Sequence, residues 1–292
     1  MTDAANPAKS PKNAPHPKSV LVIGRDRRVA EIVSEALPEW RLARAVDNET
    51  ALRLLRAEHF HLLLTGDETS GQQDIELLRE VRRTRPHVRL IILTTESTPA
   101  DVIESMKERA FSYFSAPYTA EALTEMLRHA TDAPVWDEGI ELLSATPEWL
   151  GLAARCDLRT ADRLIQFIHE FSDLPEPHRD AVGLAFREML LNAVEHGGNL
   201  DPSQHVVISY VRARDAVVCR IKDPGEGFSL EALRESAMAG MHDDPLEHME
   251  YRTAQGMRAG GYGVLLAKSM VDELIYNEKG NDVMLIKYLH RK

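Results

Sequence analysis

The sequence has little of what several protein classes require. Of its 292 residues only two are cysteine, Cys156 and Cys219, and they lie far apart outside any paired motif. This excludes a disulfide framework and gives no indication of a zinc site built on cysteine. No apolar run approaches the roughly 18 residues that a transmembrane helix needs, and the N-terminus has no apolar signal-peptide core. We therefore expect a cytoplasmic protein with no membrane partner.

Positive charge is also scarce. The chain has 35 Lys and Arg against 46 Asp and Glu, which gives a net charge of −11 at pH 7. Phosphate neutralisation supplies most of the affinity of a general nucleic-acid binder, so this balance argues against a nucleic-acid partner. Hydrophobic residues make up 43% and charged residues 28%, as in globular proteins. The length predicts two domains, each able to bury a core of its own.

Residues 1–18 are rich in Pro, Ala, Lys and Asn without an apolar period, which predicts a disordered tail. From 19 to 131, short β-branched runs alternate with amphipathic segments of helical period. Five such units predict an α/β doubly wound domain with a five-stranded parallel sheet. The predicted strands are 20–23, 40–46, 61–65, 89–93 and 111–114, and the predicted helices are 27–37, 48–59, 74–84, 99–109 and 119–130.

The strand ends of this domain resemble those of the receiver domain of two-component response regulators. The resemblance rests on Ser70-Gly71 after the third strand, Thr94 at the end of the fourth and Ala116-Pro117-Tyr118 after the fifth. It implies three further features: an acidic pair that holds Mg²⁺, a phosphoacceptor Asp and a Lys. The residues at those positions are Gly24 with Arg25, Gly66 and Ala116.

Because Mg²⁺ needs hard oxygen ligands, these replacements favour a pseudo-receiver that cannot be phosphorylated. Its expected role is docking or dimerisation, so a homodimer is one arrangement that the sequence leaves open. Asp67 lies one residue beyond the phosphoacceptor position and would act only in a shifted register, since a shift of one residue on a strand turns the side chain to the other face.

Residues 132–137 are predicted to be a linker, and residues 138–292 a second domain. Its pattern indicates a few helices packed against an antiparallel sheet, an α+β sandwich. The predicted strands are 139–145, 148–155, 205–212, 216–222, 273–277 and 283–289, and the predicted helices are 158–171, 176 to about 196, and 262–271.

Three motifs in this domain carry chemistry. On the long helix, spacing places Glu188, Asn192, Glu195 and His196 on one stripe, an arrangement that a solvated face would also show. Asp-Pro-Gly-Glu-Gly at 223–227 follows a strand, and glycines there let the backbone approach a ligand. Gly-Gly-Tyr-Gly at 260–263 precedes a helix, whose N-terminus suits an anion.

In this order the three motifs resemble those of the Bergerat-fold, or histidine-kinase-like, ATPases, and most closely those of the anti-sigma-factor serine/threonine kinases. The resemblance implies ATP and Mg²⁺ as cofactors. It implies that Asn192 ligates Mg²⁺, that Glu188 is the general base and that Asp223 accepts from the adenine amine. It further implies that Gly225 and Gly227 admit the nucleotide, that Gly261 and Gly263 cradle phosphate, that Arg258 neutralises it and that residues 229–259 form a lid.

Three functions remain open. The first is an anti-sigma-type protein serine/threonine kinase whose partner is a sigma factor or an anti-sigma-antagonist-like protein. The second is a non-catalytic module that binds and sequesters a partner in an ATP-dependent way. The third is a histidine-kinase catalytic module in a phosphorelay, although residues 135–180 offer no helical hairpin bearing a phosphoacceptor His. His242 and His248 lack a close ligand set, so no metal site is expected there.

Overall fold

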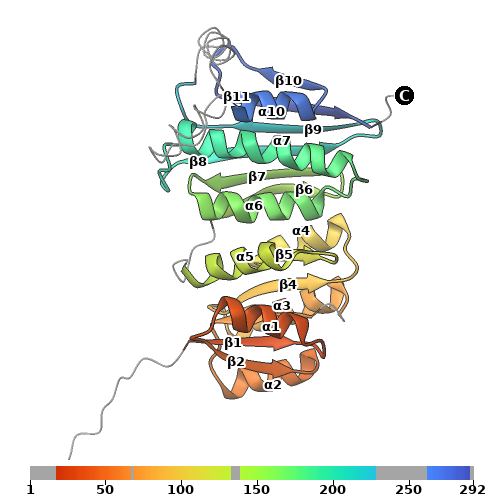
Figure 1. Cartoon of the computed structure of the whole chain (residues 1–292), viewed down its shortest axis with the longest axis vertical. Helices are drawn as coiled ribbons and strands as arrows, with labels where there is room; N and C mark the ends of the chain where they lie inside the picture. The colour runs from red at the N-terminus through yellow and green to blue at the C-terminus, as the bar shows by residue number, and fades with distance from the viewer. Residues whose placement is uncertain (1–17, 67–68, 133–138, 228–261, 290–292) are drawn as a thin grey trace, which may run out of the picture.

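The computed structural model describes residues 18–66, 69–132, 139–227 and 262–289. Within them the chain forms two units, one on a parallel sheet and one on an antiparallel sheet, that follow each other along the long axis (Figure 1). Several predictions fall outside the described residues: the tail, nearly all of the linker, the lid, and the single residues Asp67, Arg258 and Gly261. No helix in the described ranges is long and apolar enough to cross a membrane.

The first unit is a five-stranded parallel sheet in the order β2-β1-β3-β4-β5. Helices α1 and α5 pack on one face, and α2, α3 and α4 on the other, so that each face has its own apolar core. This confirms the predicted α/β doubly wound fold. The elements are β1 Ser19–Ile23, α1 Arg28–Ala36, β2 Arg41–Ala45, α2 Asn48–Ala57, β3 Leu62–Leu64, α3 Gly71–Thr84, β4 Arg89–Thr94, α4 Pro99–Lys107, β5 Ser112–Ser115 and α5 Ala120–Asp132.

Local sequence explains most element boundaries. Helix α2 begins where the Asp47 side chain accepts a 2.7 Å hydrogen bond from the Thr50 amide, and α4 begins with a capping box between Thr98 and Asp101. The predicted start of α3 at Asp74 is wrong, because the helix begins at Gly71. Asp74 lies inside the first turn with its side chain buried, where it accepts a 2.8 Å hydrogen bond from the Thr69 hydroxyl.

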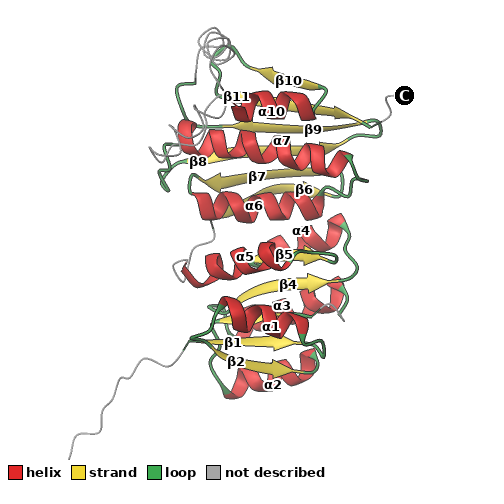
Figure 2. Ribbon diagram, in the orientation of Figure 1, coloured by secondary structure: helices red, strands yellow, loops and turns green. Residues whose placement is uncertain are grey.

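The second unit is a six-stranded antiparallel sheet in the order β10-β11-β9-β8-β7-β6, with α6, α7 and α10 in a layer on one face (Figure 2). This confirms the predicted α+β sandwich. The elements are β6 Ile140–Thr146, β7 Trp149–Arg155, α6 Leu158–Phe171, α7 His178–Asn192, a π-helical turn η1 Ala193–Gly197, β8 His205–Arg212, β9 Ala216–Lys222, α10 Tyr262–Met270, β10 Glu273–Tyr276 and β11 Asp282–Tyr288.

The two units meet where α6 packs against β5, the edge strand of the parallel sheet. The buried Arg163 donates to the Phe111 carbonyl at 2.9 Å, and its guanidinium lies 4.3 Å from the centre of the Phe111 ring. Gln166 donates to the Tyr113 carbonyl at 2.9 Å. Side chains of the second unit thus cover polar backbone of the first, which protects an edge that could otherwise pair with another chain.

Glu170 makes this junction sensitive to pH. It accepts hydrogen bonds from Gln166 and from the Ser115 hydroxyl, yet burial raises its pKa from 4.5 to about 7. The folded state therefore binds an extra proton between these two pH values, so stability falls as pH rises through that window. At about 1.4 kcal/mol per pKa unit, the loss is at most about 3.5 kcal/mol.

We predict that Glu170→Gln flattens this dependence, because the amide carries no charge to bury. Denaturant unfolding at pH 5 and pH 8 should show a smaller difference in unfolding free energy for the variant than for the wild type. Burial also raises the pKa of Asp74 to about 7, so Asp74 contributes the same pH dependence of stability to the wild type and to the variant. Glu121→Gln, on the exposed side of α5, is the control. An equal pH dependence in wild type and Glu170→Gln would contradict the prediction.

Candidate active site

Helices α7 and α10 bring the first and third motifs together. Glu188 and Asn192 lie one turn apart on α7, and both side chains are partly exposed. Gly263, in the first turn of α10, faces them: a Cβ built on it would lie 2.7 Å from Glu188 Oε2 and 3.7 Å from Asn192 Nδ2. Glycine at 263 is thus what lets the helix start reach the carboxylate and amide.

The predicted stripe of four polar residues spans a change of helix type. Helix α7 ends at Asn192, and residues Ala193–Gly197 continue as a π-helical turn, closed by the Gly198 amide bonding to the Ala193 carbonyl at 2.8 Å. The wider turn departs from the 3.6-residue period on which the predicted stripe relied, so the stripe of Glu195 and His196 with Glu188 and Asn192 stays a prediction. Such turns are frequent at functional sites.

The π-turn brings the second motif to the first. A Cβ on Gly197 would lie 2.3 Å from Cγ and Oδ1 of Asp223, so only a glycine permits this approach. Asp223 Oδ1 accepts a 2.8 Å hydrogen bond from the Gly225 amide. A Cβ on Gly225 would in turn lie 2.8 Å from both Asp223 Oδ1 and the Gly197 carbonyl oxygen. The loop and the end of the helix therefore pack backbone to backbone.

The β10–β11 hairpin holds the other side of this loop. Asn281, which is 7% exposed, donates to the Gly225 carbonyl at 3.0 Å, and Lys279 donates to the same oxygen at 3.1 Å. Asn277 donates to Asn281 Oδ1 at 2.9 Å and so fixes its orientation. Gly227 adopts a φ of 84°, and a Cβ there would overlap the Lys279 carbonyl. The hairpin thus holds the loop through two hydrogen bonds to the Gly225 carbonyl and through close packing at Gly227.

Sequence reasoning missed several of these supporting residues: Gly197, Asn277, Lys279 and Asn281. A signal existed for two of them, since the pair Asn277 and Asn281 brackets the turn between the last two strands. Gly197 directly follows the helix motif in the sequence, but only the fold shows that its missing side chain makes room for Asp223.

The surroundings of Asp223 disfavour the ionised form of its carboxyl group. Partial burial raises the pKa of its carboxyl, against the lowering effect of the hydrogen bond from Gly225. Burial, with the Asp223 charge second, also raises the pKa of Tyr276 to about 12. Cys156, buried against Gly198, has a pKa of about 11 for the same reasons. Within the described part of the chain, Asp223 Oδ2 accepts no hydrogen bond, so this oxygen is available to a donor from outside.

In contrast, the ends of strands β1 and β3 in the first unit leave no room for a side chain at the positions where the receiver resemblance implies a site. Gly66, at the predicted phosphoacceptor position, is buried, and a Cβ on it would lie 2.4 Å from the Ile23 carbonyl oxygen. Gly24 has a φ of 120°, and a Cβ there would lie 3.3 Å from Gly66 Cα. Strands β1 and β3 therefore end too close together to hold a side chain at either position.

Other polar groups at this edge are engaged in the fold itself. Arg44 donates to the carbonyls of Gly24, Arg25 and Asp26 at 3.3, 2.9 and 3.0 Å. The Thr94 hydroxyl donates to backbone carbonyls of the neighbouring loops, with the bond to the Glu96 oxygen at 2.9 Å. A guanidinium thus covers the loop where the receiver resemblance implies a magnesium-binding acidic pair.

The Gly197 contact predicts a sharp difference between two glycines of the same helical segment. Gly197→Ala should destabilise the protein by about 1–3 kcal/mol, because its Cβ must displace the Asp223 side chain. Gly183→Ala is the matched control, since a Cβ there meets nothing within 4 Å, and it should stabilise the helix by a few tenths to about 1 kcal/mol. Denaturant unfolding measures both, and a Gly197→Ala protein as stable as the wild type would contradict the geometry.

Comparison with known proteins agrees with this division. Residues 20–128 match the response regulator receiver domain, and residues 153–287 match the histidine kinase-like ATPase domain. The chemotaxis protein CheY of Pseudomonas aeruginosa is 30% identical over 103 residues, which is 35% of this chain and 83% of CheY. The serine-protein kinase RsbW of Oceanobacillus iheyensis is 27% identical over 146 residues, 50% of this chain and 82% of RsbW.

Longer regulators match only in part. The response regulator protein FleR of Pseudomonas aeruginosa is 31% identical over 145 residues, and the chain spans 30% of its length. Among solved structures, a signal receiver domain of an HD domain-containing protein from Pseudomonas fluorescens Pf-5 is 20% identical, with a TM-score of 0.36, and the match covers 40% of this chain and 96% of that one. The similarity to CheY shows that the chain belongs to the response regulator receiver family through residues 20–128, and it joins this receiver domain to a histidine kinase-like ATPase domain at residues 153–287.

Proposed function

We propose that the protein is an ATP-dependent serine/threonine kinase of the anti-sigma type, controlled through its receiver domain. The histidine kinase-like ATPase domain implies ATP binding, and the similarity to RsbW supports a protein hydroxyl as the phosphoryl acceptor. One observation carries the proposal. Gly263 lies against Glu188 and Asn192 while Gly197 lies against Asp223, so the three motifs meet around one place.

The Asp223 end of this site suits adenine. Oδ1 is held by the Gly225 amide, and Oδ2 can accept from the exocyclic amine of adenine. Guanine presents a carbonyl oxygen where adenine has the amine, so it would set two acceptors against each other. Gly225 and Gly227 keep the loop free of side chains beside this carboxylate and admit the edge of the base.

The α7 and α10 end suits the phosphates and their metal. Asn192 offers an amide oxygen of the kind that Mg²⁺ accepts. Gly263 at the start of α10 lies against the same side chains, and the N-terminus of a helix offers backbone amides to an anion. Bound Mg²⁺ would neutralise phosphate charge during transfer. Gly261 and Arg258 would add to the phosphate cradle, and residues 229–259 would cover it as a lid. All of these lie outside the described residues.

Glu188 is the residue placed to act on the acceptor hydroxyl. Its side chain is 23% exposed, enough to be reached by a docked partner, and Arg187 lies 3.6 Å from its Oε1. We propose that Glu188 orients the serine or threonine hydroxyl of the partner and takes its proton as the phosphoryl group arrives. The partner would be a sigma factor for binding and an anti-sigma-antagonist-like protein for phosphorylation.

We also propose that the receiver domain acts without phosphorylation. Three features support this: the closed contact between Gly24 and Gly66, the guanidinium of Arg44 on the β1–α1 loop, and Ala116 at the lysine position. The domain would instead present a docking surface, including one for a second copy of the chain. Asp67, the shifted candidate, lies outside the described residues.

The kinase proposal predicts that Glu188→Gln abolishes phosphoryl transfer and leaves ATP affinity within a few-fold of wild type. Removal of a general base should cost about 100-fold or more in rate, because proton transfer typically contributes that much. Transfer of labelled phosphate from ATP to the serine-bearing partner measures the rate, and titration calorimetry measures ATP binding. Glu141→Gln, on exposed β6, is the control.

Two outcomes would redirect the proposal. Transfer by Glu188→Gln at the wild-type rate would remove Glu188 from its role. A wild type that binds ATP and its partner tightly, yet transfers no phosphate, would favour the sequestering module over the kinase.

The receiver proposal predicts that Gly66→Asp does not restore phosphorylation. The new side chain would collide with the Ile23 carbonyl, so the variant should lose about 1–3 kcal/mol of stability and bind no beryllofluoride, a mimic of aspartyl phosphate. Ser70→Asp, on the exposed end of the same loop, is the matched control and should retain stability. A stable Gly66→Asp protein that binds beryllofluoride with Mg²⁺ would overturn the closed-site interpretation.

A further inference from the structure

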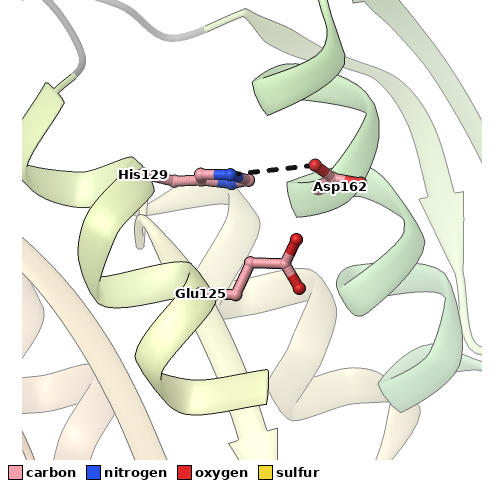
Figure 3. A group of neighbouring side chains, drawn as sticks. All are labelled: Glu125, His129 and Asp162. Atoms are coloured by element: carbon pink, nitrogen blue, oxygen red, sulfur yellow. Dashed lines mark ion pairs between the residues drawn. The ribbon is translucent and has the colours of Figure 1, made fainter. Parts of the chain in front are cut away.

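Three metal-binding side chains gather where the two domains meet. Glu125 and His129 lie one turn apart on α5 of the receiver domain, and Asp162 faces them from α6 of the ATPase domain (Figure 3). Residues four apart on a helix share a face, so the α5 pair points toward the same place. None of the three belongs to the nucleotide site or to the closed strand ends of the receiver.

Their spacing suits a shared cation better than a direct bond. His129 Nε2 and Asp162 Oδ2 are 3.8 Å apart, which is too long for a hydrogen bond. Two ligands of a tetrahedral zinc ion, each about 2.1 Å from the metal, lie about 3.4 Å from each other. One potential ligand atom from each of the three residues lies within 4.8 Å of the other two, so a modest rotation of the exposed Glu125 side chain completes the set.

The imidazole is held in place but has no hydrogen-bonding partner in the described part of the chain. The His129 side chain is 18% exposed, and its Nδ1 is buried without a hydrogen bond there, while Nε2 makes only the long contact to Asp162. A buried polar atom left without a partner costs free energy. Coordination of a metal ion through a ring nitrogen would give the His129 imidazole a partner.

The charges and donor types select the kind of ion. Two carboxylates and one neutral imidazole carry a charge of about −2, which a divalent cation neutralises. A mixed nitrogen and oxygen set suits zinc and neighbouring first-row metals, whereas Mg²⁺ prefers oxygen alone. We propose that Glu125, His129 and Asp162 form a Zn²⁺ site, with water as the fourth ligand, that ties helix α5 of the receiver domain to helix α6 of the ATPase domain.

Such a site would strengthen the junction next to the catalytic machinery. Helix α6 already contacts β5 through Arg163 and Gln166, and it packs against α7, which carries Glu188 and Asn192. A bound cation would add a third connection through Asp162, which lies one turn before Gln166 on the same face of α6. Loss of the cation would loosen the contact between α5 and α6 and leave the packing of α6 on α4 and β5 in place.

The test is a zinc titration of the untagged, nucleotide-free full chain by calorimetry. We expect one tight Zn²⁺ per chain in the wild type and at least about a 100-fold weaker affinity in His129→Ala and Asp162→Ala, since even removal of an outer partner of a metal ligand costs 10–100-fold. His205→Ala, at an exposed position on β8, is the matched control and should bind as the wild type does. Circular dichroism checks that each variant is folded.

Hydrogen exchange supplies an independent readout. Zinc should slow amide exchange in α5 and α6 of the wild type and leave both helices of His129→Ala unchanged. Absence of wild-type binding at 100 μM free Zn²⁺ would overturn the proposal. Equal binding by His129→Ala would overturn it too, because the ion would then lie elsewhere.

Discussion

The site depends on how closely two pairs of groups approach each other. Gly197 lets Asp223 reach the end of the signature helix, and Gly263 lets the start of α10 reach Glu188. In both places an added Cβ would lie less than 3 Å from the carboxylate. The two carboxylates can therefore take up their positions only because the facing residue is a glycine. The π-turn at Ala193–Gly197 contributes by widening the helix end where Asp223 docks.

Close contact between glycines has the opposite effect in the receiver domain, where it closes a site instead of forming one. Gly24 and Gly66 bring β1 and β3 so close that neither strand end can carry a side chain, and Arg44 covers the adjoining loop. The domain keeps its sheet, its two cores and its edge strand, which are the features a partner would contact. Its edge strand is also where α6 docks, and α6 packs in turn against α7, the helix that bears Glu188.

Much of the fold could be predicted from sequence because the apolar periods are clear. Both sheets, both fold classes and most element boundaries follow from them, with an error at Asp74, where a buried aspartate was mistaken for a helix start. The nucleotide-site residues could be named because three motifs occur in order. What could not be predicted depends on tertiary contact: the π-turn at Ala193–Gly197, the Asn281 anchor and the junction residues Arg163 and Glu170.

The central claim is that the three motifs form one working nucleotide site. The most direct test is calorimetric titration of the whole chain with ATP and with GTP, each in the presence and absence of Mg²⁺. The account predicts that ATP binds, that Mg²⁺ tightens the binding through Asn192, and that GTP is rejected because guanine would set its carbonyl oxygen against the accepting carboxylate of Asp223. Failure to bind ATP at millimolar concentration, or equal affinity for GTP, would contradict it.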